Sequence, residues 1–372
     1  MSKTISRRKA LTAGAAATGV AASGNLLTGC ASTAPAPVSK DQAPLPNVWG
    51  EDFMMQWTPP ENVKRDLTPG PTPIRISCAQ YGLRLGRRRG RGGAAQDENA
   101  TTPSIGDVVR GIREAGYTAA EAPGNSMNDL TDSQVRELQA ALKEHDVEFY
   151  TIHVWTNLTH PDPEIKERNI QMYITNIEAA ERVGVKNIVM HTGGADPRNQ
   201  DRPHPMNWSR ALWEEAVANT KRVIDATPGS TINLGFEAVN SHNNNTPQSH
   251  VRLKEDVGSD RVKVTLDPTN MFHPGVYFRS TELINTCFEL IGEDVVCAHA
   301  KDTLWTSMVP GLSEGYVLGE GVMDYEVYLT HLSRMKYPRC LLIEHLREPE
   351  MYDKSHAFVK ETAARLGVKI YS

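Results

Sequence analysis

From residue 74 onward, short apolar runs alternate with stretches of helical character, and few folds accommodate this alternation. The runs are continuously apolar rather than alternating with polar residues, which is typical of parallel strands buried on both faces. Eight strand–helix units in about 300 residues predict an α/β fold, a single (β/α)8 TIM barrel. The expected strands span 74–79, 117–122, 147–153, 187–192, 231–237, 262–267, 295–300 and 340–344.

The clearest helix between these strands is predicted over 163–183. Pro163 suits the first turn of a helix, isoleucines recur at near-helical spacing after it, and Gly184 marks the end. Side chains that cap helix N-termini precede other helical stretches. These expected N-caps are Ser104, Thr131 and Ser209.

A doubly wound sheet is the alternative architecture, and it would bring a glycine-rich phosphate-binding turn after the first strand. Here the first strand is followed by residues 82–86 (GLRLG) and then by 87–93 (RRRGRGG), which have neither the dinucleotide-binding spacing nor a GKS or GKT ending. The barrel is therefore favoured. The arginine run has two interpretations: a solvated loop, or a lid that clamps an anionic or polyhydroxylated ligand.

The N-terminus has the features of a targeting signal. Arg7 and Arg8 precede an apolar stretch of small residues and resemble a twin-arginine export signal. Leu27-Thr28-Gly29-Cys30 resembles a lipobox, whose cysteine, Cys30, would carry the lipid. We expect an exported lipoprotein, in the periplasm or at the cell surface, with the membrane as a partner through its anchor. The expected organisation is a signal over 1–30, a tether and N-terminal extension over 31–73, and the barrel over 74–372.

The tether is predicted from composition, because residues 31–73 contain nine prolines and no sustained periodicity. Aromatic residues and methionines within 49–57 are too apolar for a pure linker, and we expect them to pack on the barrel. No CxxC motif occurs, so the sequence does not support a structural zinc cluster, and unpaired buried thiols are the favoured interpretation of the remaining cysteines. These are Cys78, Cys287, Cys297 and Cys340.

Charge argues against a general nucleic-acid binder. The chain carries a net charge of −5, and its first thirty residues contain four cations and no acid, so the remainder is more acidic still. Binding to phosphate backbones needs a basic surface. No strongly apolar stretch after the N-terminus is long enough to span a bilayer. A small-molecule partner is therefore expected, and a homo-oligomer is compatible with the sequence.

Four successive predicted strands end in potential metal ligands. The fifth ends in Glu237, the sixth in Asp267, the seventh carries His299 and the eighth ends in Glu344. The C-terminal ends of barrel strands form the active-site face, so these groups are expected to line one arc. Carboxylate and imidazole ligands suit one divalent ion, with Mn²⁺ favoured and Mg²⁺, Co²⁺ or Zn²⁺ as alternatives.

Over about residues 74–372, the chain resembles the sugar phosphate isomerase/epimerase superfamily, the xylose isomerase-like TIM barrels. The motifs that carry the resemblance are Glu237, Leu266-Asp267 with Asn270, His299-x-Lys301-Asp302, Glu344, and the fourth-strand segment from Gly184 to Gly194. The resemblance likewise implies that Glu237, Asp267, His299 and Glu344 bind the metal. Some ketose epimerases of this superfamily have a histidine at the position of Asn270, so their substrates do not transfer directly.

Further residues are expected around the substrate. His345 is left out, because the residue after an inward-pointing Glu344 should point away from the barrel mouth. The candidate substrate-binding residues are Glu121, His153, Trp155, His191, Asn270 and Lys301.

These groups suit proton transfer next to a carbonyl. A bound ion would stabilise an enediolate, Glu237 and Glu344 would serve as the acid–base pair, and Lys301 would donate to the developing oxyanion. The expected activity is isomerisation or epimerisation of an unphosphorylated keto sugar, since an exported protein meets few sugar phosphates. Three alternatives stay open: β-elimination from a 3-keto-glycoside, a non-catalytic sugar-binding lipoprotein, and phosphodiester hydrolysis as in AP endonucleases, which the acidic charge disfavours.

Overall fold

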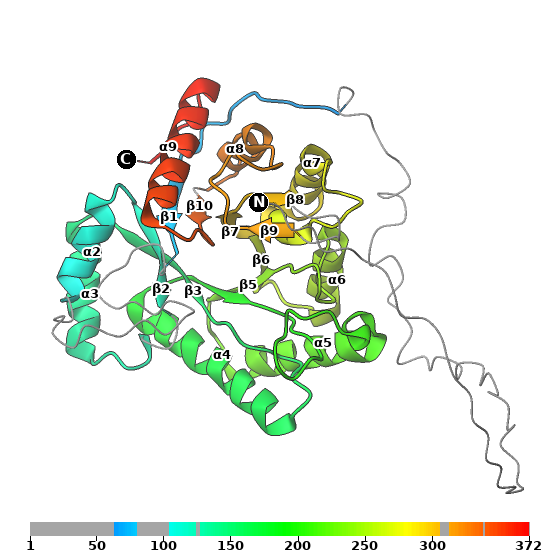
Figure 1. Ribbon diagram of the computed structural model, residues 1–372. Coiled ribbons are helices and arrows are strands. Elements are labelled where there is room, and N and C mark those ends of the chain that lie inside the picture. The colour runs from blue at the N-terminus through cyan, green and yellow to red at the C-terminus, as the bar shows by residue number, and fades with distance from the viewer. Residues whose placement is uncertain (1–62, 80–103, 124–126, 306–311, 338, 372) are drawn as a thin grey trace, which may run out of the picture. The chain divides into compact units, whose positions relative to one another are not determined.

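The computed structural model describes residues 63–79, 104–123, 127–305, 312–337 and 339–371 of the chain. Eight parallel strands close a barrel in the order β1-β10-β7-β6-β5-β4-β3-β2 (Figure 1). The predicted TIM barrel is therefore confirmed. Its strands are β1 (Ile74–Cys78), β2 (Ala119–Pro123), β3 (Glu148–His153), β4 (Asn187–Met190), β5 (Asn233–Glu237), β6 (Val262–Leu266), β7 (Val295–Ala300) and β10 (Arg339–Ile343).

Helices surround the barrel and bury their apolar faces against the strands (Figure 1). Short 3₁₀ turns at Pro205–Trp208, Thr269–Met271 and Gly292–Asp294 shape three of the connections. The α-helices are α2 (Ile105–Glu114), α3 (Asp132–Glu144), α4 (Pro163–Val183), α5 (Arg210–Ala226), α6 (Pro247–Val257), α7 (Ser280–Ile291), α8 (Tyr325–Ser333) and α9 (Pro349–Leu366).

Local sequence signals place the helix ends where they were expected. Helix α4 has the predicted bounds and ends at Gly184, which adopts a left-handed φ of 94°. Ser104, Thr131 and Ser209 each accept a hydrogen bond from a backbone N–H of the first turn, so all three are N-caps as predicted. These three caps fix where the connections that lead from β1, β2 and β4 into the following helices end.

Two features were not predicted. A small antiparallel hairpin, β8 (Thr303–Trp305) with β9 (Leu312–Glu314), follows β7 at the C-terminal end of the barrel. The last residues of the chain also return to the first strand, because the Ile74 N–H donates to the Lys369 carbonyl and the Tyr371 N–H donates to the Ile74 carbonyl, each at 2.9 Å. The C-terminus therefore reinforces the edge at which the barrel closes.

The segment just before β1 docks on helix α8. The Gly70 N–H donates to Ser333 Oγ at 2.8 Å, and a Cβ at Gly70 would lie 2.3 Å from the Ser333 carbonyl oxygen. Arg65 forms ion pairs with Asp324 and Glu326. Residues 49–57, Cys30 and the arginine run at 87–93 lie outside the described residues.

The four described cysteines are buried and form no disulfide, which confirms the sequence-based interpretation. Cys297 and Cys340 are neighbours across the β7–β10 pair, and burial raises the pKa of the Cys78 and Cys287 thiols. Within the described residues, no helix is both long enough and apolar enough to cross a membrane.

His331 on α8 is expected to make the stability of the protein sensitive to acid. Burial lowers the pKa of this imidazole to about 4, whereas the unfolded chain has a histidine pKa of about 6.5. The unfolded state therefore binds the proton first, and stability falls as the pH drops from about 6.5 towards 4. The variant His331→Phe keeps the stacking on Phe288. We expect its melting temperature to fall less over that pH range than the melting temperature of the wild type.

Thermal melts of both proteins between pH 7.5 and 4, in the absence of metal, measure this difference. Part of the pH dependence should remain in the variant, because burial also lowers the pKa of His250 to about 4. Equal pH dependence in the two proteins would show that His331 does not contribute.

Candidate active site

Four side chains from successive strand ends converge at the C-terminal end of the barrel. Glu237 ends β5, Asp267 follows β6, His299 lies on β7 and Glu344 follows β10. Each offers a ligand atom, and these atoms lie within 4.8 Å of one another. All four residues are at most 2% exposed. The four groups lie together because each stands at or near the C-terminal end of an apolar strand. In a barrel, these strand ends share one face.

Hydrogen bonds and ion pairs orient this group. His299 Nδ1 lies 2.9 Å from Glu344 Oε1 and 3.3 Å from Glu237 Oε1. The Lys301 ammonium lies 2.7 Å from Asp267 Oδ2 and 3.2 Å from Glu344 Oε1. Asp267 Oδ1 accepts hydrogen bonds from two backbone N–H groups of the loop after β6. The four groups are therefore held from several strands at once.

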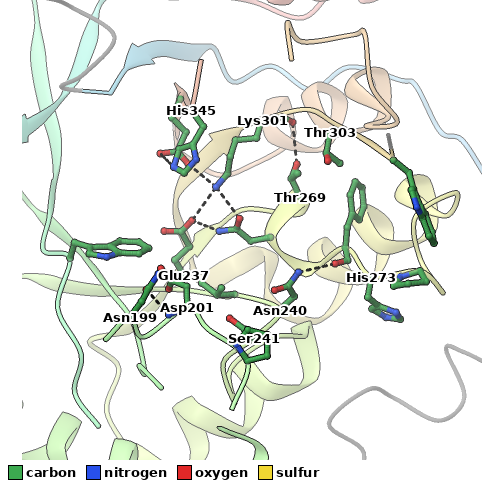
Figure 2. Close-up of a pocket in the computed structure, with 18 of the residues that line it drawn as sticks. Asn199, Asp201, Glu237, Asn240, Ser241, Thr269, His273, Lys301, Thr303 and His345 are labelled. Atoms are coloured by element: carbon green, nitrogen blue, oxygen red, sulfur yellow. Dashed lines mark hydrogen bonds and ion pairs between the residues drawn. The ribbon is translucent and has the colours of Figure 1, made fainter. Parts of the chain in front are cut away.

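Asn270 links the lysine to the carboxylates. Its Nδ2 donates to Glu237 Oε1 at 2.7 Å, and its Oδ1 accepts from Lys301 Nζ at 2.9 Å. Figure 2 shows Lys301 pointing toward Glu237 across the pocket. The asparagine thus bridges a cation and an anion.

The charges of the group shift its pKa values. Burial opposes ionisation of Glu237 and Glu344, but the positive charges of His299 and Lys301 outweigh it and lower both pKa values. Burial raises the pKa of Asp267 to about 6, against the attraction of Lys301. Burial disfavours the charged form of His299, yet Glu344 and Glu237 hold its pKa well above the usual range. The group is a concentration of negative charge that attracts cations.

The donor set fits a divalent ion. Three carboxylates and an imidazole face one another in a buried space, and Glu237 Oε2 and Glu344 Oε2 make no hydrogen bond to any described residue. Buried carboxylate oxygens without a partner are costly, and a cation satisfies them. Oxygen and imidazole ligands of this kind suit Mn²⁺, Mg²⁺, Co²⁺ or Zn²⁺.

A second group of possible ligands adjoins the first. His153, His191 and Glu237 also place ligand atoms within 4.8 Å of one another, and the two histidine Nε2 atoms are 3.3 Å apart. Burial lowers the pKa of His191 to about 3, so this ring is neutral. Glu121 Oε2 lies 3.3 Å from His153 Nδ1 and orients that ring from behind. Glu237 belongs to both groups.

A cavity of about 560 Å³ opens beside these groups. Of the predicted substrate-binding residues, His153, Trp155, Asn270 and Lys301 line it, whereas Glu121 and His191 lie behind its wall. Residues from loops that follow the strands complete the lining, and nothing in the periodicity of the sequence marks them. These loop residues include Asn199, Asp201, Asn240, Ser241 and His273 (Figure 2).

The structure corrects the exclusion of His345. This residue lines the cavity, although strand alternation predicts that it points away when Glu344 points inward. Its backbone adopts a left-handed φ of 61°, which ends the alternation at Glu344. The ring therefore lies at the cavity mouth, with Nε2 3.9 Å from Glu344 Oε2.

Asp302, which follows Lys301, organises the chain around the hairpin. Its carboxylate accepts hydrogen bonds from the backbone N–H groups of Thr303, Gly319, Gly321 and Met323. A Cβ at Gly321 would lie 2.0 Å from Asp302 Oδ1, so this close approach requires glycine. Asp302 thereby ties the start of the hairpin to the segment before α8 without lining the cavity.

Comparisons with known proteins agree with the barrel fold. The Xylose isomerase-like TIM barrel family matches residues 109–362. The probable endonuclease 4 of Campylobacter concisus is 25% identical over 165 residues, which cover 42% of this chain and 55% of that protein. The chain thus matches about half the length of this curated relative.

Solved structures show the same fold at low sequence identity. Endonuclease IV from Thermus thermophilus has a TM-score of 0.57 at 16% identity, covering 78% of this chain and 99% of that one. The 3-keto-D-glucoside 4-epimerase of E. coli has a TM-score of 0.55 at 16% identity, covering 79% and 99%. Since the family match spans most of the barrel, the chain belongs to the Xylose isomerase-like TIM barrel family.

Proposed function

We propose that the protein is a metal-dependent isomerase or epimerase of an unphosphorylated keto sugar, acting by proton abstraction next to the carbonyl. One observation carries this proposal. Of the four converging side chains, Glu237 and Glu344 line the cavity, while Asp267 and His299 lie behind them. The carboxylates of Glu237 and Glu344 can therefore contact a substrate in the cavity. An acid–base pair requires two such groups.

Each residue has a defined task in this reaction. An ion held by Glu237, Asp267, His299 and Glu344 would supply Lewis-acid polarisation of the substrate carbonyl. Glu344 and Glu237 are ionised at neutral pH, because His299 and Lys301 lower their pKa values. One carboxylate removes the proton from the carbon next to the carbonyl, and the other returns it. Lys301 lies within reach of the same space and donates to the oxygen on which negative charge develops.

The charge of the cavity supports an unphosphorylated substrate. Asp201, Glu237 and Glu344 contribute negative charge to the described lining, and Lys301 is the single lysine or arginine there. Phosphate recognition generally uses arginine clusters or open backbone N–H groups. A neutral sugar, bound through its hydroxyl groups, suits this lining better.

The site supports elimination from a 3-keto-glycoside through the same first step, so the product must be identified directly. We would incubate the Mn²⁺-loaded protein with keto sugars and with 3-keto-glycosides and follow the products by NMR. A new ketose or aldose supports isomerisation or epimerisation, and a released aglycone supports the lyase alternative. Tight sugar binding without any product would support the non-catalytic alternative and contradict the proposal.

Phosphodiester hydrolysis is a second candidate function, and the group of His153, His191 and Glu237 favours it, since nucleases of this chemistry use several metal ions. Metal content and nuclease activity separate the two functions. One ion per chain, with no cleavage of intact or partially depurinated plasmid DNA, supports the sugar enzyme. Two or more ions with cleavage of depurinated DNA would support the nuclease.

We also propose export and lipid anchoring through Cys30, from Arg7-Arg8 and the Leu27–Cys30 motif. Replacing Cys30 with Ala removes the lipidated thiol and is expected to move the protein from the membrane fraction to the soluble fraction. Cys78→Ala, which changes a buried thiol of the barrel, is the matched control and should leave the fractionation unchanged. An unaltered membrane fraction for Cys30→Ala would exclude the anchor.

A further inference from the structure

We propose that the substrate is a glycoside or oligosaccharide whose second sugar ring binds in a side hollow next to the metal cavity. This inference rests on the proposed function, because it assumes that the keto sugar occupies the main cavity. The side hollow has a volume of about 400 Å³. It shares Trp155 and Asn199 with the main cavity of about 560 Å³, so the two spaces adjoin.

Trp155 forms the wall between the two spaces. The indole packs against His191 at a centroid distance of 4.6 Å and against His153 at 5.4 Å. Its remaining surface is open, and the side chain is 52% exposed. A large aromatic residue held in place on one side and open on the other offers an apolar face to the C–H groups of a sugar ring. Trp155 was predicted as a substrate-binding residue, and this placement supports that role.

The lining of the side hollow includes four side-chain amides, of Asn157, Asn169, Asn199 and Gln200, and one ion pair. Asp196 and Arg198 neutralise each other at 2.8 Å. The Gln200 side chain is 6% exposed, and neither its Oε1 nor its Nε2 makes a hydrogen bond to a described residue. A buried amide without partners is costly. Amides that both donate and accept are suited to sugar hydroxyls, so the lining selects a neutral polyhydroxylated ligand.

The wall of the side hollow is rigid. Asn157 Oδ1 accepts hydrogen bonds from the Thr159 and Gly194 backbone N–H groups, and Asn157 Nδ2 donates to the Gly194 carbonyl at 2.7 Å. A Cβ at Gly193 would lie 1.9 Å from Asn157 Oδ1, so the loops after β3 and β4 lock together without a gap. A preformed wall of this kind lowers the ordering cost of binding.

The side hollow adjoins the main cavity at Trp155 and Asn199, so a second ring attached to the keto sugar can lie in it. Asn199, Asp201, Glu237 and Thr303 line the same cavity, and in Figure 2 Thr303 lies on the other side of the view from Asn199 and Asp201. A ring with its carbonyl beside Glu237 and Glu344 can therefore extend over Trp155 into the hollow. The main cavity of about 560 Å³ lies within the roughly 300–1,000 Å³ range of small-molecule sites.

Calorimetric titration of the full-length, Mn²⁺-loaded protein tests this inference. The probes are D-fructose and its 4-O- and 6-O-glucosyl derivatives, maltulose and isomaltulose, which keep the ketose and add one ring. We expect at least one disaccharide to bind about tenfold more tightly than D-fructose, the gain typical of an aromatic platform with hydrogen bonds. Trp155→Ala should abolish this gain, and Trp155→Phe should restore most of it.

Gln200→Leu tests the side hollow without touching the main cavity. It replaces a buried, unpaired amide by an apolar group of similar size, so the melting temperature should not fall. Its D-fructose affinity should equal that of the wild type, while the disaccharide gain should drop severalfold. Trp305 lies on another wall of the main cavity. Trp305→Ala is therefore the control for a second ring that binds on that side, and it should retain the higher affinity for the disaccharide.

The outcomes separate failure of this inference from failure of the proposed function. Equal binding of D-fructose and both disaccharides, or loss of the gain in Trp305→Ala but not in Trp155→Ala, overturns the second subsite and leaves the sugar enzyme standing. No binding of any of the three sugars, together with no product from the keto-sugar screen, overturns both.

Discussion

Glu344→Gln is expected to lower turnover of the keto-sugar substrate by about 10²–10⁴-fold, the usual contribution of a positioned general base. Glu344 lines the cavity, and its Oε2 makes no hydrogen bond to a described residue, so one oxygen is available to a substrate proton. Glutamine has nearly the same shape, but its amide cannot accept that proton. The loss should therefore appear in the chemical step and not in the fold.

Deuterium exchange measures this step without assuming the final product. The protein, saturating Mn²⁺ and the keto sugar are incubated in D₂O, and NMR follows deuterium at the carbon next to the carbonyl. The wild type should incorporate deuterium, and Glu344→Gln should not, even when metal analysis shows that it retains the ion. Glu350→Gln, the same change at an exposed position of α9, is the control. Full turnover by Glu344→Gln would remove it from the mechanism.

Adding Mn²⁺ to the metal-free protein is expected to raise its melting temperature by roughly 5–15 °C when the ion is about a thousandfold above its dissociation constant. In the metal-free protein, Glu237, Asp267 and Glu344 are buried together, and their mutual repulsion is opposed by Lys301 and His299. A divalent ion binds the folded state only, because the unfolded chain does not bring the four strand ends together.

Asp267→Asn should abolish most of this metal-induced rise, as measured by differential scanning calorimetry. The same variant should lose little stability without metal, because it removes one of three crowded negative charges together with the 2.7 Å contact to Lys301. Asp201→Asn is the matched control: Asp201 lines the same cavity, pairs with His242 at 3.1 Å, and stands outside the four-residue group. A rise of equal size in Asp267→Asn would place the ion elsewhere.

The barrel and the four-residue group were predictable because both depend on local patterns. Each apolar run became a strand within about two residues of its predicted bounds, and the C-terminal ends of the strands share one face of the barrel. Glu237, Asp267, His299 and Glu344 were found in this way. The helix bounds around α4 followed from Pro163 and Gly184, whose backbone preferences do not depend on tertiary contacts.

The rest of the site depends on the paths of loops, which no periodicity encodes. Asn199 and Asp201 reach the cavity from the long connection after β4, and His345 enters it through a left-handed backbone that strand alternation does not anticipate. The bridging of Lys301 and Glu237 by Asn270 likewise depends on the turn after β6. Such contacts form between segments far apart in sequence, so only the folded chain shows them.

The pairing of the first strand with the last governs when the protein can finish folding. β1 hydrogen-bonds to β10, and Ile74 also bridges to Ile370. A ribosome adds about 5–20 residues per second, so β1 waits roughly 13–50 s between its own synthesis and that of its partner. During that interval one edge of an apolar strand stays unpaired and prone to aggregation. A truncation that removes α9 and the last residues, and with them the bridge from Ile370 to Ile74, should therefore yield insoluble protein.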